Sequence, residues 1–147
     1  MSPARPVHLH WRYIGLVALG GAVGTAAREG LSLAVPNIGA YPSTIFAVNV
    51  VGAFLLGVLL DALVRQGPDA GGRRAMRLLL GTGAMGGFTT YSTLATDTAL
   101  LFRDGAAGLA VTYSLATVLG GAAATALGIV VATSAHRRRQ RRAGESE

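Results

Sequence analysis

Four long apolar runs dominate this chain, and short polar or charged stretches separate them. The runs cover about 14–33, 44–64, 78–102 and 108–134. Each run has the length of about 20 apolar residues that an α-helix needs to cross the hydrocarbon core of a bilayer. We therefore expect an all-α membrane protein with four transmembrane helices in one domain over residues 1–147, ending in a basic tail at 135–147.

The stretches between the runs carry signals that end helices. Pro36 and Pro42 separate the first two runs, and proline removes a backbone donor and clashes with the preceding turn. A polar, glycine-rich loop at 65–74 separates the second and third runs, and Asp104–Gly105 marks a tight turn before the fourth. The first run is longer than the apolar region of a signal peptide, so we expect it to remain as a helix.

Composition excludes several kinds of site. The chain is 51% hydrophobic, 14% charged and has no cysteine, which excludes disulfides, thiolate catalysis and cysteine-based metal sites. Its histidines, His8, His10 and His136, lie near the termini, which argues against a buried histidine-based metal centre. The sequence shows no nucleophile–base–orienter set, no paired carboxylates and no metal-ligand spacing, so we expect no enzyme.

The positions of the charges predict an orientation. All thirteen basic residues are arginine. If the four runs alternate in direction, one side of the membrane holds eleven arginines, namely Arg5, Arg12, Arg65, Arg73, Arg74, Arg77, Arg137, Arg138, Arg139, Arg141 and Arg142. The loops on the other side hold only Arg103, so we expect a multi-pass protein of the cell (inner or plasma) membrane with both termini in the cytoplasm. The arginines form no stripe with interleaved aromatic residues, so we expect no nucleic-acid partner.

Small residues recur at four-residue spacing in the first and fourth runs. Gly20 and Gly24 form one such face, and Gly120, Ala124 and Gly128 form another. Such faces let helix backbones approach closely in lipid, where packing drives association. Four thin helices cannot easily enclose a polar path alone, so we also expect an oligomer.

The third run contains the most unusual segment, GAMGGFTTYSTLATD at 83–97. Lipid offers no hydrogen bonds, so a span this rich in glycines and hydroxyl groups indicates a route for something polar. GTGAMG at 81–86 matches a dinucleotide fingerprint, but that motif needs a preceding strand and here follows an arginine-rich loop. Two interpretations stay open: close helix packing by small residues, or a helix break whose backbone groups bind an ion.

Polar residues in the other runs also allow two interpretations each. Asn49 lies in the middle of the second run, where it is either an interhelical hydrogen-bonding residue or an amide donor for a dehydrating anion. Arg28 either snorkels to the interface or attracts anions at a pore mouth, and the adjacent Glu29 neutralises it.

Hydroxyl groups form two further candidate sets. Tyr113 and Thr117 share a helix face, but hydroxyls in membrane helices commonly bond back to their own carbonyls, so this pair is weak evidence. A stronger cluster of donors comprises Thr89, Thr90, Ser92 and Thr93. Asp97, one turn beyond Thr93, is an ionisable group in or near the membrane and needs a partner.

Taken together, these residues resemble the CrcB/Fluc family of fluoride channels. The resemblance covers nearly all four runs. Its carriers are GGAVGTAARE at 20–29, TIFAVNVVGAFLLGVL at 44–59 and GTGAMGGFTTYSTLATD at 81–97, whose order and spacing are highly specific together. It implies a fluoride-specific ion channel that lowers cytoplasmic fluoride by passive export, built as a dual-topology dimer of two antiparallel subunits with a break in the third helix.

The resemblance also implies roles for single residues. The backbone carbonyls of Gly86 and Thr89 would hold a structural Na⁺ at the dimer centre, and Arg28 matches a vestibule arginine. The implied pore residues are Asn49, Phe88, Tyr91, Ser92, Thr93, Leu94, Tyr113 and Thr117. These roles fit the chemistry, because a small, tightly hydrated anion needs closely placed donors, and a fixed cation raises the local potential for it.

Two departures from the family pattern shape our expectation about the partner. The chain reads TTYSTL at 89–94 where the family usually has TTFSTF, so Tyr91 keeps a ring and Leu94 has none. The arginines are biased eleven to one, whereas a dual-topology homodimer needs near balance. We therefore hypothesise a heterodimer with an oppositely oriented homologue, the alternative being a homodimer with altered pores.

Two other functions stay open from the sequence. One is a non-conducting structural subunit of a membrane complex, which would tolerate hydrophobic replacement of Asn49 and of the hydroxyl cluster at 89–93; the other is an exporter. A small dual-topology, proton-coupled multidrug exporter would also have four short helices. That function needs a membrane carboxylate free to exchange protons, and Glu29 lies beside Arg28 while Asp97 lies late in the third run.

Overall fold

The computed structural model describes residues 10–144 of the 147-residue chain, so Arg5, His8 and the last three residues lie outside it. Its elements are α1 (Trp11–Ala34), α2 (Ser43–Arg65), α3 (Gly71–Met76), the π-helix η2 (Arg77–Met85), α4 (Gly86–Phe88), α5 (Tyr91–Arg103) and α6 (Ala107–Gly144). Among the described residues the β pairing is limited to one isolated bridge between Ile38 and Tyr41. The predicted all-α class is confirmed.

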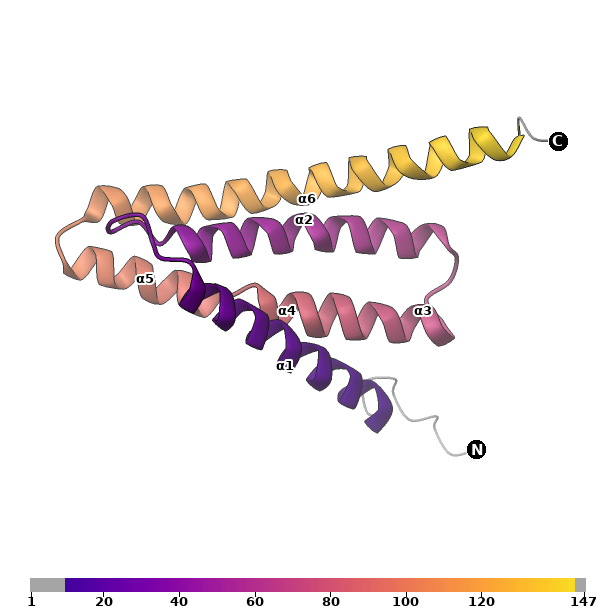
Figure 1. The fold of residues 1–147 in the computed structure, drawn as a ribbon, viewed down its shortest axis with the longest axis horizontal. Helices are drawn as coiled ribbons and strands as arrows, with labels where there is room; N and C mark the ends of the chain where they lie inside the picture. The colour runs from indigo at the N-terminus through magenta and orange to yellow at the C-terminus, as the bar shows by residue number, and fades with distance from the viewer. Residues whose placement is uncertain (1–9, 145–147) are drawn as a thin grey trace, which may run out of the picture.

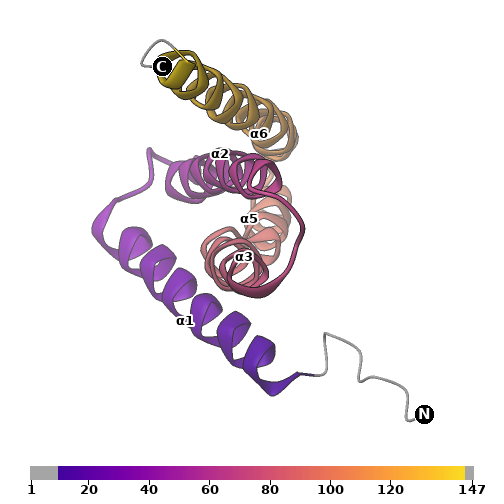
Figure 2. The same cartoon turned by 90° about the vertical axis from the view of Figure 1, so that its right-hand side faces the viewer.

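The helices form four rods that alternate in direction (Figure 1). The short elements α3, η2, α4 and α5 follow one another as a single interrupted rod. The α2 and α6 rods pack side by side, and α1 crosses the interrupted rod at η2 (Figures 1 and 2). The start of α1, the loop at 66–70 and the end of α6 all lie toward one end of the molecule, as the predicted alternation requires.

Two helices are long and apolar enough to cross a membrane: α2, with 23 residues, and the part of α6 at Ala107–Arg142. The expected third span, 78–102, is divided among three elements, η2, α4 and α5, each shorter than 18 residues. Helix α1 contains the charged pair Arg28 and Glu29. That α1 and the interrupted rod also cross the membrane therefore stays a prediction.

The last helix is longer than the expected span at 108–134, because α6 continues through most of the basic tail to Gly144. Residues 135–143 contain neither glycine nor proline, and arginine is a good helix former. Nothing in the tail sequence ends the helix where its apolar part stops.

Small residues set the closest contacts between rods, as predicted. Gly20 and Gly24 of α1 are buried, and a Cβ on them would meet the carbonyl oxygens of Leu79 and Ala84 in the interrupted rod. Gly128 of α6 likewise lies against the backbone of α2. Larger side chains at these positions would force the rods apart.

The buried core is small for the chain's apolar content. It comprises Ile45, Val48, Leu63, Leu94, Leu101, Ala110 and Tyr113. Many large apolar side chains on every rod are instead exposed, among them Leu19, Val23, Leu115, Val118 and Leu119. Exposed apolar surface on this scale marks contact with lipid or with another subunit.

Candidate functional site at a broken helix

The interrupted rod breaks at Thr89 and Thr90, where the backbone becomes extended between α4 and α5. Before the break, η2 runs for nine residues as a π-helix, a rare conformation that concentrates at functional sites. The structure shows the close packing of the first interpretation of the glycine-rich segment and the helix break of the second, while ion binding at the break stays a prediction. Gly83 and Gly87 pack against the backbone of α1, and the helix also breaks just beyond them.

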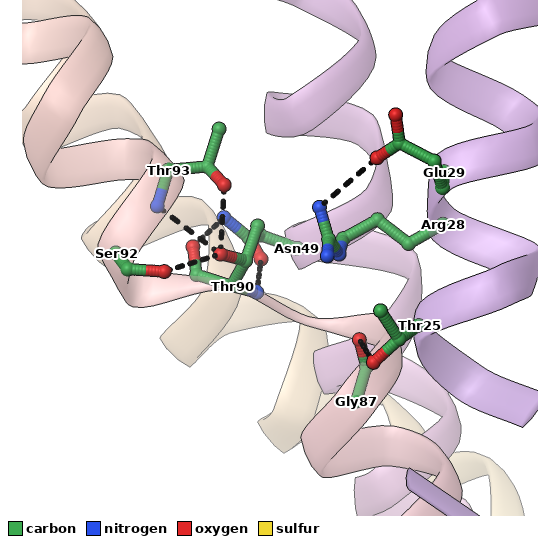
Figure 3. A network of polar contacts seen from close by, with 8 residues as sticks. All are labelled: Thr25, Arg28, Glu29, Asn49, Gly87, Thr90, Ser92 and Thr93. Atoms are coloured by element: carbon green, nitrogen blue, oxygen red, sulfur yellow. Dashed lines mark hydrogen bonds and ion pairs between the residues drawn. The ribbon is translucent and has the colours of Figure 1, made fainter. Parts of the chain in front are cut away.

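Asn49 of α2 holds the extended segment through both backbone groups of Thr90 (Figure 3). The N–H of Thr90 donates to Asn49 Oδ1 at 2.7 Å, and Asn49 Nδ2 donates to the carbonyl of Thr90 at 3.2 Å. This is the interhelical hydrogen bond that the sequence allowed. An amide nitrogen carries two N–H donors, so one remains beyond the bond to Thr90.

The break releases carbonyl groups from helical hydrogen bonding, among them those of Gly86 and Thr89. In a continuous helix the N–H of residue i+4 donates to each carbonyl. Thr90 N–H, four residues after Gly86, donates to Asn49 instead. Thr93 N–H, four residues after Thr89, donates to Thr90 Oγ1 at 3.1 Å. The carbonyls of Gly86 and Thr89 therefore lack their usual helical donors.

The hydroxyl cluster caps the start of α5. Thr90 Oγ1 accepts from the N–H of Thr93 and donates to Thr93 Oγ1 at 2.9 Å. Ser92 Oγ lies 3.2 Å from the same Thr90 oxygen and is exposed (Figure 3). Three of the four predicted hydroxyls thus form a connected network centred on Thr90, with Ser92 at its open edge. The fourth, Thr89 Oγ1, instead donates to the carbonyl of Met85 at 2.8 Å.

An open groove of about 320 Å³ runs along the break between α2, α5 and α6. We call it the break groove. Its lining includes Asn49, Thr89, Thr90, Tyr91, Leu94, Thr117 and Thr125. The structure therefore brings together several residues that lie far apart in the sequence and that were predicted to act at one site.

The residues that line the break groove differ in how exposed their side chains are. Tyr91 is 81% exposed, whereas Leu94 is 7% exposed and packs in the core with Tyr113. Thr117 is buried and donates to the carbonyl of Tyr113 at 2.7 Å, the back-bonding that makes such hydroxyls weak evidence.

A separate cavity of about 260 Å³ contains Arg28, together with Ser32, Asn37, Thr93 and Asp97. Here Arg28 Nη1 lies 3.8 Å from Glu29, while Arg28 Nε and Ser32 Oγ are buried and have no hydrogen-bond partner among residues 10–144. Arg28 is thus separated from Tyr91 and Thr117, which the sequence could not show.

Asp97 finds its partner on the next helix. The buried Tyr113 donates its hydroxyl to Asp97 Oδ2 at 3.2 Å. The sequence predicted that Asp97 needs a partner but did not identify one. The sequence did contain a signal for this pair. Asp97 and Tyr113 lie equally far from Gly105 in the turn that joins α5 to α6, and residues equally far from a tight turn lie opposite each other on the two helices.

Phe88, the last residue of α4, lies away from the break groove. It lines an apolar cavity of about 390 Å³ with Leu31, Val48 and Val51. A Cβ on Gly52 would clash with the methyl group of Thr89 and would lie 3.2 Å from the Phe88 ring, so α2 approaches the end of α4 closely there. The predicted pore residue is therefore packed on the other side of the break.

The loop end of the molecule carries a compact ion cluster. In the loop at 66–70, Asp69 Oδ2 lies 2.8 Å from Arg77 Nη2 and 3.5 Å from Arg74 Nε. The hydrogen bond from Arg77 is the main reason that the pKa of Asp69 lies below its ordinary value. Desolvation opposes this shift.

Comparison with known proteins places the chain. A family model described as "CrcB-like protein, Camphor Resistance (CrcB)" matches residues 15–129. The Fluoride-specific ion channel FluC 2 of Leifsonia xyli subsp. xyli is 50% identical over 126 residues, covering 86% of this chain and 87% of that protein. The Fluoride-specific ion channel FluC 1 of Cutibacterium acnes is 44% identical over 110 residues, covering 74% and 77%. The FluC protein of Novosphingobium aromaticivorans is 41% identical over 120 residues.

The fold and the site define the class of protein: it is all-helical, two of its helices are long and apolar enough to cross a membrane, and one of its four rods has a polar break. The match spans most of the chain and includes the break and all of α1 from residue 15 onward. The chain belongs to the CrcB-like family.

Proposed function

We propose that this chain is a subunit of a fluoride-specific ion channel that lets fluoride leave the cytoplasm passively. The observation that carries the proposal is the helix break held by Asn49, which opens onto a groove lined by four of the eight residues expected to form the pore, namely Asn49, Tyr91, Leu94 and Thr117. The relatives named as fluoride-specific ion channels support the choice of ion. A channel of this kind conducts without chemical catalysis.

The break groove has the chemistry that a dehydrated fluoride ion needs. Fluoride gives up tightly held water only if closely placed donors replace it. Asn49 retains one amide N–H, and the exposed ring of Tyr91 presents its positive edge. Ser92, which is exposed next to Tyr91 but is not a lining residue of the groove, offers a further hydroxyl beside it. Because the groove is open on one side, a second subunit would have to close it.

A structural Na⁺ fits the carbonyls that the break releases. Hard cations prefer oxygen ligands, and the carbonyls of Gly86 and Thr89 have lost their helical donors. A Cβ on Gly86 would meet nothing within 4 Å, so its surroundings are open on the side where a second subunit would contribute. When bound, the cation would add fixed positive charge near the anion path.

We further propose an antiparallel dimer whose second subunit is an oppositely oriented homologue. The arginine bias predicts one orientation for this chain, with both termini in the cytoplasm. Leu94, at a position where the family has a ring, is already packed in the core against Tyr113. The partner would then supply the missing ring, and a homodimer with altered pores is the alternative.

Fluoride release from reconstituted vesicles tests the proposal. Vesicles loaded with potassium fluoride receive the chain alone or with an oppositely oriented homologue, and a fluoride electrode records efflux after addition of a potassium ionophore. We expect efflux that Ser92→Ala slows and that Ser134→Ala, an exposed serine outside both cavities, leaves unchanged.

The outcomes separate the alternatives. Vesicles that stay sealed to fluoride with every partner would overturn the channel function. Full conduction by the chain alone would overturn the heterodimer. Flux that needs a proton gradient and stops in Asp97→Asn would favour a proton-coupled exporter instead.

A further inference from the structure

The C-terminal part of α6 carries five arginines beyond the end of α2 (Figure 1). We call residues 137–142 the arginine tail. At 1.5 Å per residue the 38 residues of α6 span about 57 Å, whereas the hydrocarbon core of a bilayer is about 30 Å thick. A large part of α6 must therefore lie outside the hydrocarbon.

Contacts with α2 show where α6 leaves the bundle. Arg65, the last residue of α2, donates to Thr133 Oγ1 at 2.7 Å and forms an ion pair with Asp61. The tail begins four residues after Thr133, and Arg142 lies about 14 Å beyond that level. If the charged Arg65, which ends α2 and contacts Thr133, marks the edge of the hydrocarbon, a headgroup layer about 5–7 Å thick contains the start of the tail, and the tail passes through it.

Side-chain direction brings the guanidinium groups back toward the bilayer. In an α-helix the Cα–Cβ bonds tilt toward the N-terminus, and long side chains follow this direction. The N-terminal direction of α6 points from the tail into the membrane span. Even Arg141 and Arg142 can therefore reach the depth of the headgroups.

The arginines occupy the free face of the helix. At about 100° per residue they cover an arc of about 200°. The remaining arc holds His136 and Gln140, whose side chains lie 3.0 Å apart and continue the face that Thr133 turns to α2. All five arginines are exposed.

The tail charge is also uncompensated within the described chain. Arg65, Arg74 and Arg77, near the same end of the molecule, each pair with an aspartate. In contrast, no arginine of the tail forms an ion pair with any of residues 10–144, and α6 contains no aspartate or glutamate. Within residues 10–144, these charges therefore have no carboxylate partner that would compete with an external anion.

We propose that the arginine tail binds the phosphate groups of anionic phospholipids in the leaflet from which α6 emerges. The inference rests on the membrane placement in the proposed function and is independent of fluoride conduction. Guanidinium groups bind phosphate oxygens in pairs, and a run of arginines directly after a membrane helix is drawn to an anionic leaflet. A lipid is the expected occupant because the helix itself delivers the tail to headgroup depth.

Lipid binding to the purified full chain in detergent micelles tests this assignment. The probes are dioctanoyl phosphatidylglycerol and dioctanoyl phosphatidylcholine, and native mass spectrometry counts the lipids retained. We expect phosphatidylglycerol to be retained at a concentration about ten-fold lower than phosphatidylcholine, with the preference falling as salt is raised. The preference should vanish when Arg137, Arg138, Arg139, Arg141 and Arg142 are all changed to Gln.

Two controls make the result specific. Changing the same five arginines to Lys keeps the charge and should keep most of the preference, and Arg103→Gln at the other end of the molecule should change nothing. An undiminished preference in the five-Gln variant would overturn the inference, as would tighter binding of a short RNA than of dioctanoyl phosphatidylglycerol under the same conditions. Lipid preference without fluoride efflux would instead count against the proposed function alone.

Discussion

Replacing Asn49 with Ala removes the two hydrogen bonds that hold the extended segment at Thr90. Interhelical hydrogen bonds in membrane proteins contribute about 0.6 kcal/mol on average, and a typical net hydrogen bond about 1 kcal/mol. The pair is therefore worth between about 1 and 2 kcal/mol, which corresponds to about 5- to 30-fold in the equilibrium for opening the break.

Amide hydrogen exchange at Thr90 measures this opening directly, because its N–H donates to Asn49 Oδ1. In isotope-labelled protein in micelles, Asn49→Ala should raise the exchange rate of that amide by the same factor. Thr125→Val is the matched control, since it removes a bond from Thr125 Oγ1 to the carbonyl of Ala53 in the same groove without touching the break. If the Thr90 amide exchanges within about two-fold of its original rate in Asn49→Ala, the side chain does not hold the break.

Two further predictions concern packing and charge. Gly24→Ala should destabilise the chain by about 1–3 kcal/mol in thermal melts in detergent, because the new Cβ would meet the backbone of Ala84. Gly15→Ala, with nothing within 4 Å of its Cβ, should be neutral or slightly stabilising, and equal losses in both variants would contradict the close-packing explanation. Because Arg77 lowers the pKa of Asp69, their pairing stabilises the fold above the ordinary carboxyl pKa of 3.8 and is lost as pH falls through the lower folded value. Asp69→Asn should therefore lower the melting temperature at neutral pH and flatten its fall on acidification below about pH 4, and an unchanged acid limb would refute this role.

The rods and their closest contacts could be predicted because they depend on local patterns. Apolar runs of sufficient length predicted the helices, and small residues four apart predicted that Gly20 and Gly24 would meet another backbone. The end of α6 was less predictable. The charge of the arginine run predicted a polar tail. However, arginine has good helix propensity and the run contains no residue that stops the preceding helix, so the helix continues.

The polar contacts were harder to predict because they depend on how the rods are aligned. Thr90 meets Asn49 only if α2 and the interrupted rod have one particular axial offset, and nothing in either segment fixes that offset. The division of Arg28 and Tyr91 into two cavities has the same cause. The contact between Asp97 and Tyr113 is different, since a tight hairpin turn makes it deducible by counting residues on each side.

The break also places two opposite electrical poles beside each other, away from the ends of the rod. Peptide dipoles sum along a helix to about half a positive charge at its start and half a negative charge at its finish. At Thr89 and Thr90 the negative C-terminal end of the helical segment that finishes with α4 adjoins the positive N-terminal end of the thirteen-residue α5. One interruption of the backbone thus creates neighbouring places suited to a cation and to an anion, without a single ionised side chain.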